Sequence, residues 1–298
     1  MGSAEEYGLE GAMSLRSLDV LVAKAGDLRA VSTVARKVLD LINADHASAP
    51  ILGDALSKDQ SLAAHILKVA NSAFYNLSRE ITNLPMAVSV LGLRNLRDQI
   101  LAAAARGAYK RFGITEKMLW SHSVACAIGA RMLAKRYATH LAEDAFICGL
   151  LHDMGKVVMN NECPAEFTEV MMLTYNEGHS SVRAEMEIFG YSHTQVGALI
   201  SRNWNYPQII TEVAFQHHNG EETRPPIENP DLEKVLACID LSNTACKILG
   251  VGYREPNLEI SLTPRPAMGT LNIPESHLPG LVSAVNDTYL KESAGWAT

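Results

Sequence analysis

Histidine and aspartate side chains recur in this sequence at positions where the neighbouring residues are apolar and the spacing is helical. The candidates are His122, His152, Asp153, His193, His217, His218 and Asp240. An imidazole or carboxylate removed from water needs a hydrogen-bond partner, a counter-charge or a cation. Imidazole and carboxylate together suit iron, manganese or zinc, and one carboxylate can bridge two ions about 4 Å apart. The set therefore predicts a site for one or two divalent metal ions.

Two adjacent pairs within this set stand at predicted helix ends. His152 and Asp153 follow an apolar segment and precede Gly155, whereas His217 and His218 end a second helix before an Asn-Gly pair. Neighbouring helix positions point about 100° apart, so adjacent side chains converge most easily at a helix terminus, where the backbone can bend. We therefore expect each pair to direct both side chains to one centre.

The remaining candidates lie inside predicted helices. His122 and His193 each share a helix face with small or apolar residues, so both imidazoles should point inward. The segment from Ser192 to Gln195 has the form of a capping box, which predicts a helix beginning at His193. Asp240 lies in a short apolar stretch, where a lone carboxylate would be costly. All three side chains are therefore expected to be buried and paired.

Structural roles compete with metal binding at each position. A lone histidine on an apolar face is more often a hydrogen-bonded core residue than a ligand. Asp240 could cap a neighbouring helix or pair with an arginine, and Lys156 could be a solvated charge at a helix end. Five further histidines belong to no cluster, namely His46, His65, His140, His179 and His277. The grouping of the seven candidates into five clusters favours metal binding.

The elements that must position these residues are predicted to be helices, because apolar residues recur at steps of three and four and strand-like alternation is scarce. Asp59 or Ser61 is expected to cap one helix and Thr115 a long one, and Gly155 is expected to interrupt a third. The expected helices cover residues 31–42, 51–56, 62–70, 84–91, 115–136, 145–159 and 275–290, with loops at 219–230 and 250–274. The predicted fold class is all-α.

The composition is that of a globular protein, since 47% of the 298 residues are apolar and 20% are charged. No apolar run reaches the length of about 18 residues that a membrane span needs, and residues 1–11 carry acids where a signal peptide carries bases. We therefore expect a cytoplasmic protein without a membrane anchor. The five cysteines occur singly, so they are expected to be reduced core residues rather than a disulfide framework or a zinc ribbon.

The formal charge of -7 disfavours non-specific nucleic-acid binding, because phosphate contacts supply most of that affinity. The segment 94–111 is locally basic. It is expected to form one solvated helix face rather than a binding site.

The run from Gly149 to Lys156, GLLHDMGK, resembles the defining signature of the HD superfamily of metal-dependent phosphohydrolases. With His122 upstream and Asp240 downstream, the superfamily's ligand order H...HD...D is complete. The resemblance implies that these histidines and aspartates bind metal. It also places Asp153 and Lys156 at a catalytic centre.

Three upstream segments resemble the HDOD family, a branch of the HD superfamily found in bacterial signalling proteins. They are KDQSL at 58–62, LKVANSAFY at 67–75 and VLGL at 90–93, and the resemblance covers roughly residues 25–220. It implies a multi-helical core of the HD-domain/PDEase type with an additional N-terminal helical subdomain. We place the subdomain at residues 1–110 and the metal-binding core at 111–298.

A further resemblance concerns the second half of the site. His193, His217 and His218 match the additional histidines that hold a second metal in HD-GYP phosphodiesterases, with Asp153 as the bridge. No Gly-Tyr-Pro element follows these histidines, and Met118 stands where those enzymes can supply a carboxylate. The resemblance therefore implies a second metal, but not hydrolysis of a cyclic dinucleotide.

Two functions are consistent with these observations. The first is a bacterial signalling or regulatory module that binds metal and a nucleotide or phosphorylated ligand, with helical surfaces that contact signalling partners. The alternative is a metal-dependent phosphohydrolase or phosphodiesterase with a dinuclear site, in which Lys156 neutralises developing charge. An enzyme needs an open cleft beside the metals, whereas a module tolerates a closed cluster.

Overall fold

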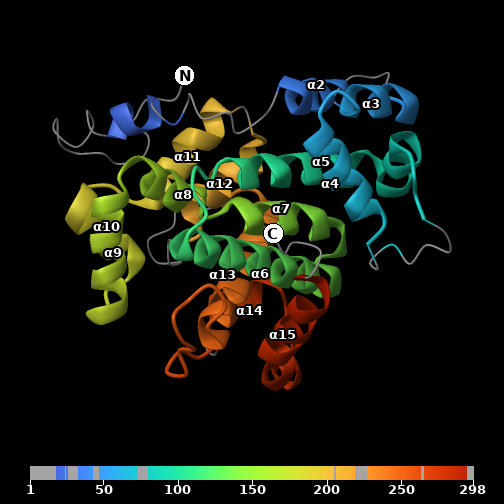
Figure 1. The fold of residues 1–298 in the computed structure, drawn as a ribbon. Helices are drawn as coiled ribbons and strands as arrows, with labels where there is room; N and C mark the ends of the chain where they lie inside the picture. Colours follow the sequence, from blue (N-terminus) through green and yellow to red (C-terminus); the bar gives the residue numbers. More distant parts are fainter. Residues whose placement is uncertain are drawn as a thin grey trace. The chain divides into compact units, whose positions relative to one another are not determined.

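The computed structural model describes residues 18–23, 25, 33–42, 47–72, 75, 80–204, 206–218, 227–262 and 265–293. Within these ranges every regular element is a helix and none is a strand (Figure 1), which confirms the predicted all-α fold. The described residues form two compact units. One comprises residues from 29–108 with those from 289–298, and the other comprises residues from 1–28 with those from 109–288.

The smaller unit is a set of helices around one apolar core. Its helices are α2 (Thr33–Ile42), α3 (Ala49–Leu56), α4 (Gln60–Ala70) and α5 (Leu84–Gly107). Helix α5 packs against each of the other three. Asp59 caps α4 by accepting a hydrogen bond of 3.0 Å from the Leu62 amide, so Asp59 rather than Ser61 fills the predicted capping role. Gly92, with φ of 72°, bends α5.

The larger unit holds all of the predicted site residues. Its elements are α6 (Ile114–Tyr137), η3 (Thr139–Leu141), α7 (Ala142–Leu151), α8 (Met154–Glu162), α9 (Pro164–Asn176), α10 (Ser181–Phe189), α11 (His193–Asn203), α12 (Gln208–Gln216), α13 (Pro230–Leu249), α14 (Pro266–Thr270), η4 (Glu275–Gly280) and the part of α15 (Leu281–Glu292) up to residue 288. Helix α6 lies between α7 and α13 and packs on both (Figure 1). Helix α6 carries His122 and α7 ends at His152 and Asp153, so this packing positions three of the predicted site residues.

Small residues let these three helices approach closely. A Cβ atom at Gly149 of α7 would lie 2.9 Å from the Ala127 Cα atom of α6. A Cβ atom at Gly129 of α6 would overlap the Ser242 side chain of α13, whose hydroxyl donates a 2.9 Å hydrogen bond to the Cys126 carbonyl. Tight backbone contacts on both sides of α6 fix where its inward side chains point.

Several predicted boundaries differ from the observed ones. The long helix begins at Ile114 rather than after a Thr115 cap, because the Glu116 carboxylate accepts a hydrogen bond of 2.8 Å from the Gly113 amide. The predicted helix at 145–159 is broken at His152 and Asp153, and Gly155 lies inside α8 instead. The predicted loop at 250–274 contains α14, and residues 275–280 form a 3-10 turn before α15.

Some expectations fall outside the described residues. The expected start of the first helix at residues 31 and 32, the position of His46 and most of the loop at 219–230 cannot be compared. The five cysteines are all reduced thiols, as expected. In the part of the chain that the structure covers, no helix is both long and apolar enough to cross a membrane.

Candidate metal centre

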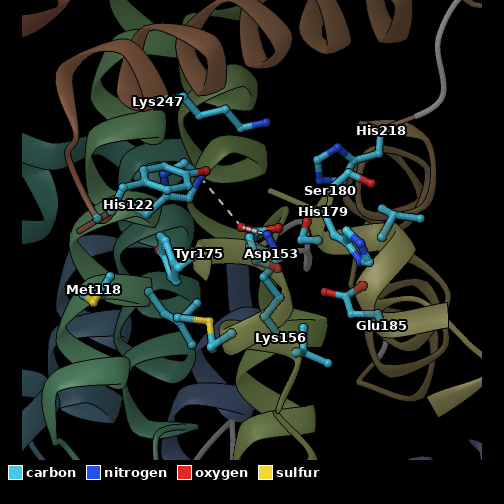
Figure 2. Close-up of a pocket in the computed structure, with 18 of the residues that line it drawn as sticks. Met118, His122, Asp153, Lys156, Tyr175, His179, Ser180, Glu185, His218 and Lys247 are labelled. Carbon is cyan, nitrogen blue, oxygen red and sulfur yellow. Dashed lines mark hydrogen bonds and ion pairs between the residues drawn. The ribbon is translucent and has the colours of Figure 1, made fainter. Parts of the chain in front are cut away.

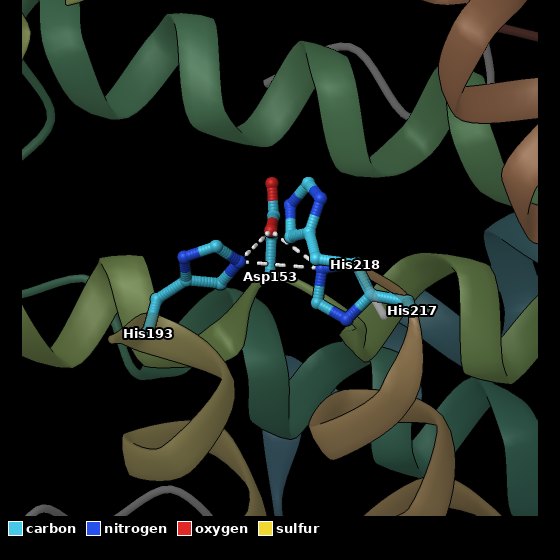
Figure 3. Close-up of side chains that lie close together, drawn as sticks. All are labelled: Asp153, His193, His217 and His218. Carbon is cyan, nitrogen blue, oxygen red and sulfur yellow. Dashed lines mark hydrogen bonds and ion pairs between the residues drawn. The ribbon is translucent and has the colours of Figure 1, made fainter. Parts of the chain in front are cut away.

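The break between α7 and α8 places the Asp153 carboxylate among four imidazole rings. Its Oδ2 atom lies 3.7 Å from His122 Nε2 and 3.5 Å from His152 Nε2. Its Oδ1 atom lies 3.2 Å from His193 Nε2 and 3.4 Å from His217 Nε2 (Figure 3). The two oxygens of one carboxylate thus face two different sets of imidazole nitrogens.

These side chains form two groups that share Asp153. The three-residue group consists of His122, His152 and Asp153, and the four-residue group consists of Asp153, His193, His217 and His218. Within each group the potential ligand atoms lie within 4.8 Å of one another. Six of the seven predicted ligands are therefore brought together, in the arrangement that a bridging carboxylate between two ions requires.

Hydrogen bonds on the outer side of the rings set the histidine tautomers. His152 Nδ1 donates to the Gly149 carbonyl at 2.7 Å, and His217 Nδ1 donates to the Ala214 carbonyl at 3.0 Å. A carbonyl oxygen only accepts, so the proton of each neutral ring is on Nδ1 and the lone pair is on Nε2. Both Nε2 lone pairs therefore point toward Asp153, which is the tautomer that a metal ligand needs.

His193 is oriented by a buried acid. The Oε2 atom of Glu185 lies 2.6 Å from His193 Nδ1 and accepts a 2.8 Å hydrogen bond from the His193 backbone amide. Burial alone would lower the pKa of His193, but the adjacent Glu185 carboxylate outweighs it and raises that pKa. Glu185 is fully buried on α10. Sequence reasoning missed it, because no local pattern distinguishes it from the exposed acid Glu187 two residues later.

The other rings and the central carboxylate are held in the protonation states that metal binding needs. Burial lowers the pKa of His122 and of His152 to about 3 and the pKa of His217 to about 4. Burial alone would raise the pKa of Asp153, but the Lys156 ammonium and His152 outweigh it and hold that pKa well below its usual value. His122, His152 and His217 are thus neutral imidazoles beside an ionised carboxylate.

Several polar atoms at this centre are buried and have no hydrogen-bond partner among the residues that the structure describes. They are Nδ1 and Nε2 of His122, Nε2 of His152, Nε2 of His218 and Oδ1 of Asp153. Such atoms are rare in folded proteins and usually indicate a missing water or ion. Nitrogen and carboxylate donors converging on one point fit a divalent cation such as iron, manganese or zinc. The residues present therefore fit one or two metal ions.

Asp240 is the one predicted ligand that the structure does not bring to the centre. Its carboxylate accepts hydrogen bonds of 2.6 and 2.9 Å from Arg265 Nη1, the arginine pairing considered as its alternative role. Helix α13 runs antiparallel to α6. The Ser242 hydroxyl of α13 is bonded to the Cys126 carbonyl, and the chain comes close to His122 only at Gly252, after α13 has ended. Asp240, which lies between Ile239 and Ser242, is therefore at the level of Cys126 rather than of His122.

Lys156 is directed inward rather than into solvent. Its ammonium lies in the first turn of α8 and donates a 2.8 Å hydrogen bond to Asp153 Oδ2, with 13% of its side chain exposed. This geometry argues against a solvated charge at a helix end.

The four described histidines outside the centre have other neighbours, in agreement with their exclusion from any cluster. His65 bonds Gln99, His140 pairs with Asp231, His277 bonds Tyr137, and His179 Nδ1 lies 3.6 Å from a carboxylate oxygen of Glu187.

A cleft of about 1000 Å³ opens over the centre. His122, Asp153 and His218 form part of its lining, together with Lys156 and Lys247. The lining also includes Met118 and Tyr175, which Figure 2 shows on the same side of the cleft as His122, and Tyr253. The Tyr253 ring packs edge-on against His122, with 5.2 Å between ring centroids.

Substituting Glu185 is expected to weaken metal binding. Glu185→Gln keeps the size of the side chain but removes the charge that orients and polarises His193, so metal affinity should fall by about 10-fold. Isothermal titration with manganese measures the effect. The matched control is Glu187→Gln on the same helix, which should bind metal as the wild type does. Equal affinities in the two variants would show that Glu185 does not support the centre.

Substituting Gly155 is expected to disrupt the packing of α8 on α11. An added Cβ atom would overlap the His193 carbonyl oxygen and lie 2.9 Å from the Gly197 amide nitrogen. Because these are backbone atoms, relief requires the two helices to separate, and Gly155→Ala should lower the free energy of unfolding by about 3 kcal/mol. Urea denaturation of metal-free protein tests this. Gly269→Ala, whose Cβ would meet nothing within 4 Å, is the control. Equal denaturation midpoints for the two variants would contradict the prediction.

The fold and the centre define an HD-like all-α protein. Residues 28–220 match the HDOD domain family. This match covers more than half of the chain, which therefore belongs to the HDOD family.

Similar proteins of known structure share the fold over nearly the whole chain. An HDOD domain protein of unknown function from Geobacter sulfurreducens is 24% identical and superposes with a TM-score of 0.71, covering 93% of this chain and 99% of its own. A Shewanella amazonensis SB2B protein, described as a candidate phosphohydrolase, is 23% identical with a TM-score of 0.68, covering 97% and 100%.

An uncharacterised protein from Treponema pallidum (strain Nichols) is 27% identical over 177 residues, which is 58% of this chain and 34% of that protein. The chain thus spans about a third of the length of this relative.

Proposed function

We propose that this protein is a metal-dependent phosphohydrolase whose reaction takes place in the cleft over Asp153. The observation that carries the proposal is the position of the Asp153 carboxylate, whose two oxygens each face a separate set of imidazole nitrogens on the lining of an open cleft. A closed and fully enclosed cluster would favour a purely structural metal. The cleft gives a phosphorylated ligand access to the centre.

The two groups of ligands that share Asp153 would each hold one metal ion. His193, His217 and His218 would hold one ion, His122 and His152 would hold the other, and Asp153 would contact both. Bound divalent ions supply a water molecule of lowered pKa and neutralise charge on phosphoryl oxygens.

The side chains around the metal ligands have separate roles. Glu185 holds the ring of His193 in place. Tyr253 packs on His122 and limits water access to the three-residue group. Lys156 donates a hydrogen bond to Asp153 Oδ2 and would supply positive charge beside a phosphoryl oxygen. Together these residues orient the ligands and place positive charge where negative charge develops.

A regulatory module that binds metal and a phosphorylated ligand without turnover is the second candidate. The burial of the cluster favours this second candidate, since His152, His193 and His217 are at most 6% exposed. A buried cluster of this kind can also serve as a structural centre. The signalling role and the protein partners expected for such a module would then depend on the ligand-bound state.

Hydrolysis assays distinguish the two candidates. The protein is loaded with manganese, iron or zinc, its metal content is measured, and p-nitrophenyl phosphate and bis(p-nitrophenyl) phosphate are offered as a monoester and a diester. If p-nitrophenol is released only with metal, and if the Asp153→Asn variant does not release it, the result supports the phosphohydrolase. Full metal content without turnover of a broad panel of phosphate esters supports the module. Activity that survives in Asp153→Asn would show that this centre is not responsible.

A further inference from the structure

Lys247 is a second cation that faces the centre, and sequence reasoning did not single it out. It lies in the last turn of α13 and lines the same cleft as Asp153 and Lys156. Figure 2 shows the Lys247 and Lys156 side chains on two sides of Asp153, from different helices. A ligand bound over Asp153 would therefore lie between two ammonium groups.

The Lys247 ammonium has no hydrogen bond or ion pair with any other residue that the structure describes. Burial lowers its pKa, and the positive charge of Lys156 acts in the same direction. An unpaired cation in a mostly buried position costs free energy, and its retention indicates a partner of opposite charge. The nearby carboxylates of Asp153 and Asp240 favour the charged form of Lys247, but Asp153 is bonded to Lys156 and Asp240 to Arg265. Of the other carboxylates in the cleft lining, Glu185 is occupied by His193, and Glu255 and Glu259 are exposed.

We propose that Lys247 and Lys156 together bind a dianionic phosphoryl group, so that the cleft selects phosphate monoesters over diesters. The inference rests on the proposed function for the location of the ligand. Two ammonium groups on different helices match two negative charges on the non-bridging oxygens of one phosphate. A diester carries a single charge and would leave one lysine without its counter-charge.

A structural explanation for Lys247 is also available. A lysine near the C-terminal end of a helix is stabilised by the helix dipole, whatever its side chain contacts. This explanation predicts that removing the charge changes stability slightly and leaves ligand preference unchanged. The ratio of monoester to diester affinity therefore separates the two explanations.

The test measures binding of methyl phosphate and dimethyl phosphate to manganese-loaded protein by isothermal titration at about pH 8, where the monoester is a dianion because its second pKa is about 6. The wild type is expected to bind methyl phosphate more tightly. Lys247→Gln should raise the Kd for methyl phosphate by about 10-fold or more, the equivalent of one charge-assisted hydrogen bond. The Kd for dimethyl phosphate should change by less than about 3-fold.

Two control variants accompany the test. Lys247→Arg keeps the charge and should retain most of the preference for the monoester. Lys234→Gln removes a lysine from the same helix but outside the cleft lining and should change neither affinity. All three variants should bind the wild-type amount of manganese, because none of the substituted residues belongs to the two ligand groups.

The outcomes are separable from those of the proposed function. The protein could prefer methyl phosphate in a way that depends on Lys247 and yet hydrolyse no ester. This result would contradict the proposed phosphohydrolase activity and would support the proposed role of Lys247. Wild-type affinity in Lys247→Gln, an equal loss for both esters, or no measurable binding of methyl phosphate to the wild type would each overturn the inference.

Discussion

Asp153→Asn is expected to abolish metal binding to the proposed centre at micromolar metal. The substitution preserves the shape of the side chain but leaves a neutral amide with one acceptor oxygen among the imidazoles. Each of the two ligand groups then loses its only anionic ligand. We expect the affinity of both sites to fall by more than about 100-fold, at the upper end of effects seen for residues that support a metal site.

Metal content after dialysis, measured by inductively coupled plasma mass spectrometry, tests this prediction. The matched control is Asp240→Asn, which removes a carboxylate that the structure places in an ion pair with Arg265. It should retain the wild-type metal content, although its loss of the ion pair can reduce stability. Loss of metal in Asp240→Asn together with retention in Asp153→Asn would reverse the assignment of the central carboxylate.

Metal binding is expected to stabilise the folded protein strongly. The ligand groups belong to the larger unit and are drawn from α6, α11 and the ends of α7 and α12, so an ion that binds them links elements that are distant in the sequence. At free metal about 1,000-fold above Kd, binding to the folded state alone contributes about 4 kcal/mol. For a unit of this size, that should raise the unfolding midpoint by roughly 8–16 °C.

Differential scanning calorimetry of chelator-treated and manganese-loaded protein measures the shift. Because both ligand groups share Asp153, the Asp153→Asn variant should show little or no stabilisation by the same manganese concentration. A wild-type midpoint that does not respond to manganese, zinc or iron would contradict the prediction and the metal centre with it.

Local sequence patterns predicted the helix boundaries of this site well where the hydrogen bonds that set them join residues close in the sequence. The capping box at Ser192 predicted that α11 begins at His193, and the structure has that boundary, because the Gln195 side chain accepts a hydrogen bond from the Ser192 amide. At the start of α6 the prediction of the N-cap residue from local sequence was wrong. Thr115 was expected to be the cap, but the N-cap is Gly113, whose amide donates a hydrogen bond to the Glu116 carboxylate.

The break between α7 and α8 shows why helix termini were harder to predict than helices. Gly155 was expected to interrupt the apolar segment, because glycine often ends a helix. In the structure Gly155 stays helical, since its lack of a Cβ atom is needed where α8 meets the backbone of α11. The chain bends two residues earlier, at His152 and Asp153. The reason for the glycine is a tertiary contact that no local pattern reveals.

The sequence by itself determined the all-α fold class and six of the side chains that converge, because residue type and helical spacing decide which side chains are driven inward. Only the tertiary structure decided which inward groups meet. The antiparallel packing of α13 on α6 takes Asp240 away from His122 and pairs it with Arg265, whereas the end of the same helix brings Lys247 to the cleft. Likewise, Glu185 reaches His193 because α10 folds back beside the start of α11. The direction in which one helix crosses another is set by contacts between residues that are distant in the sequence. This direction determined which residues lie at the metal centre and in the cleft.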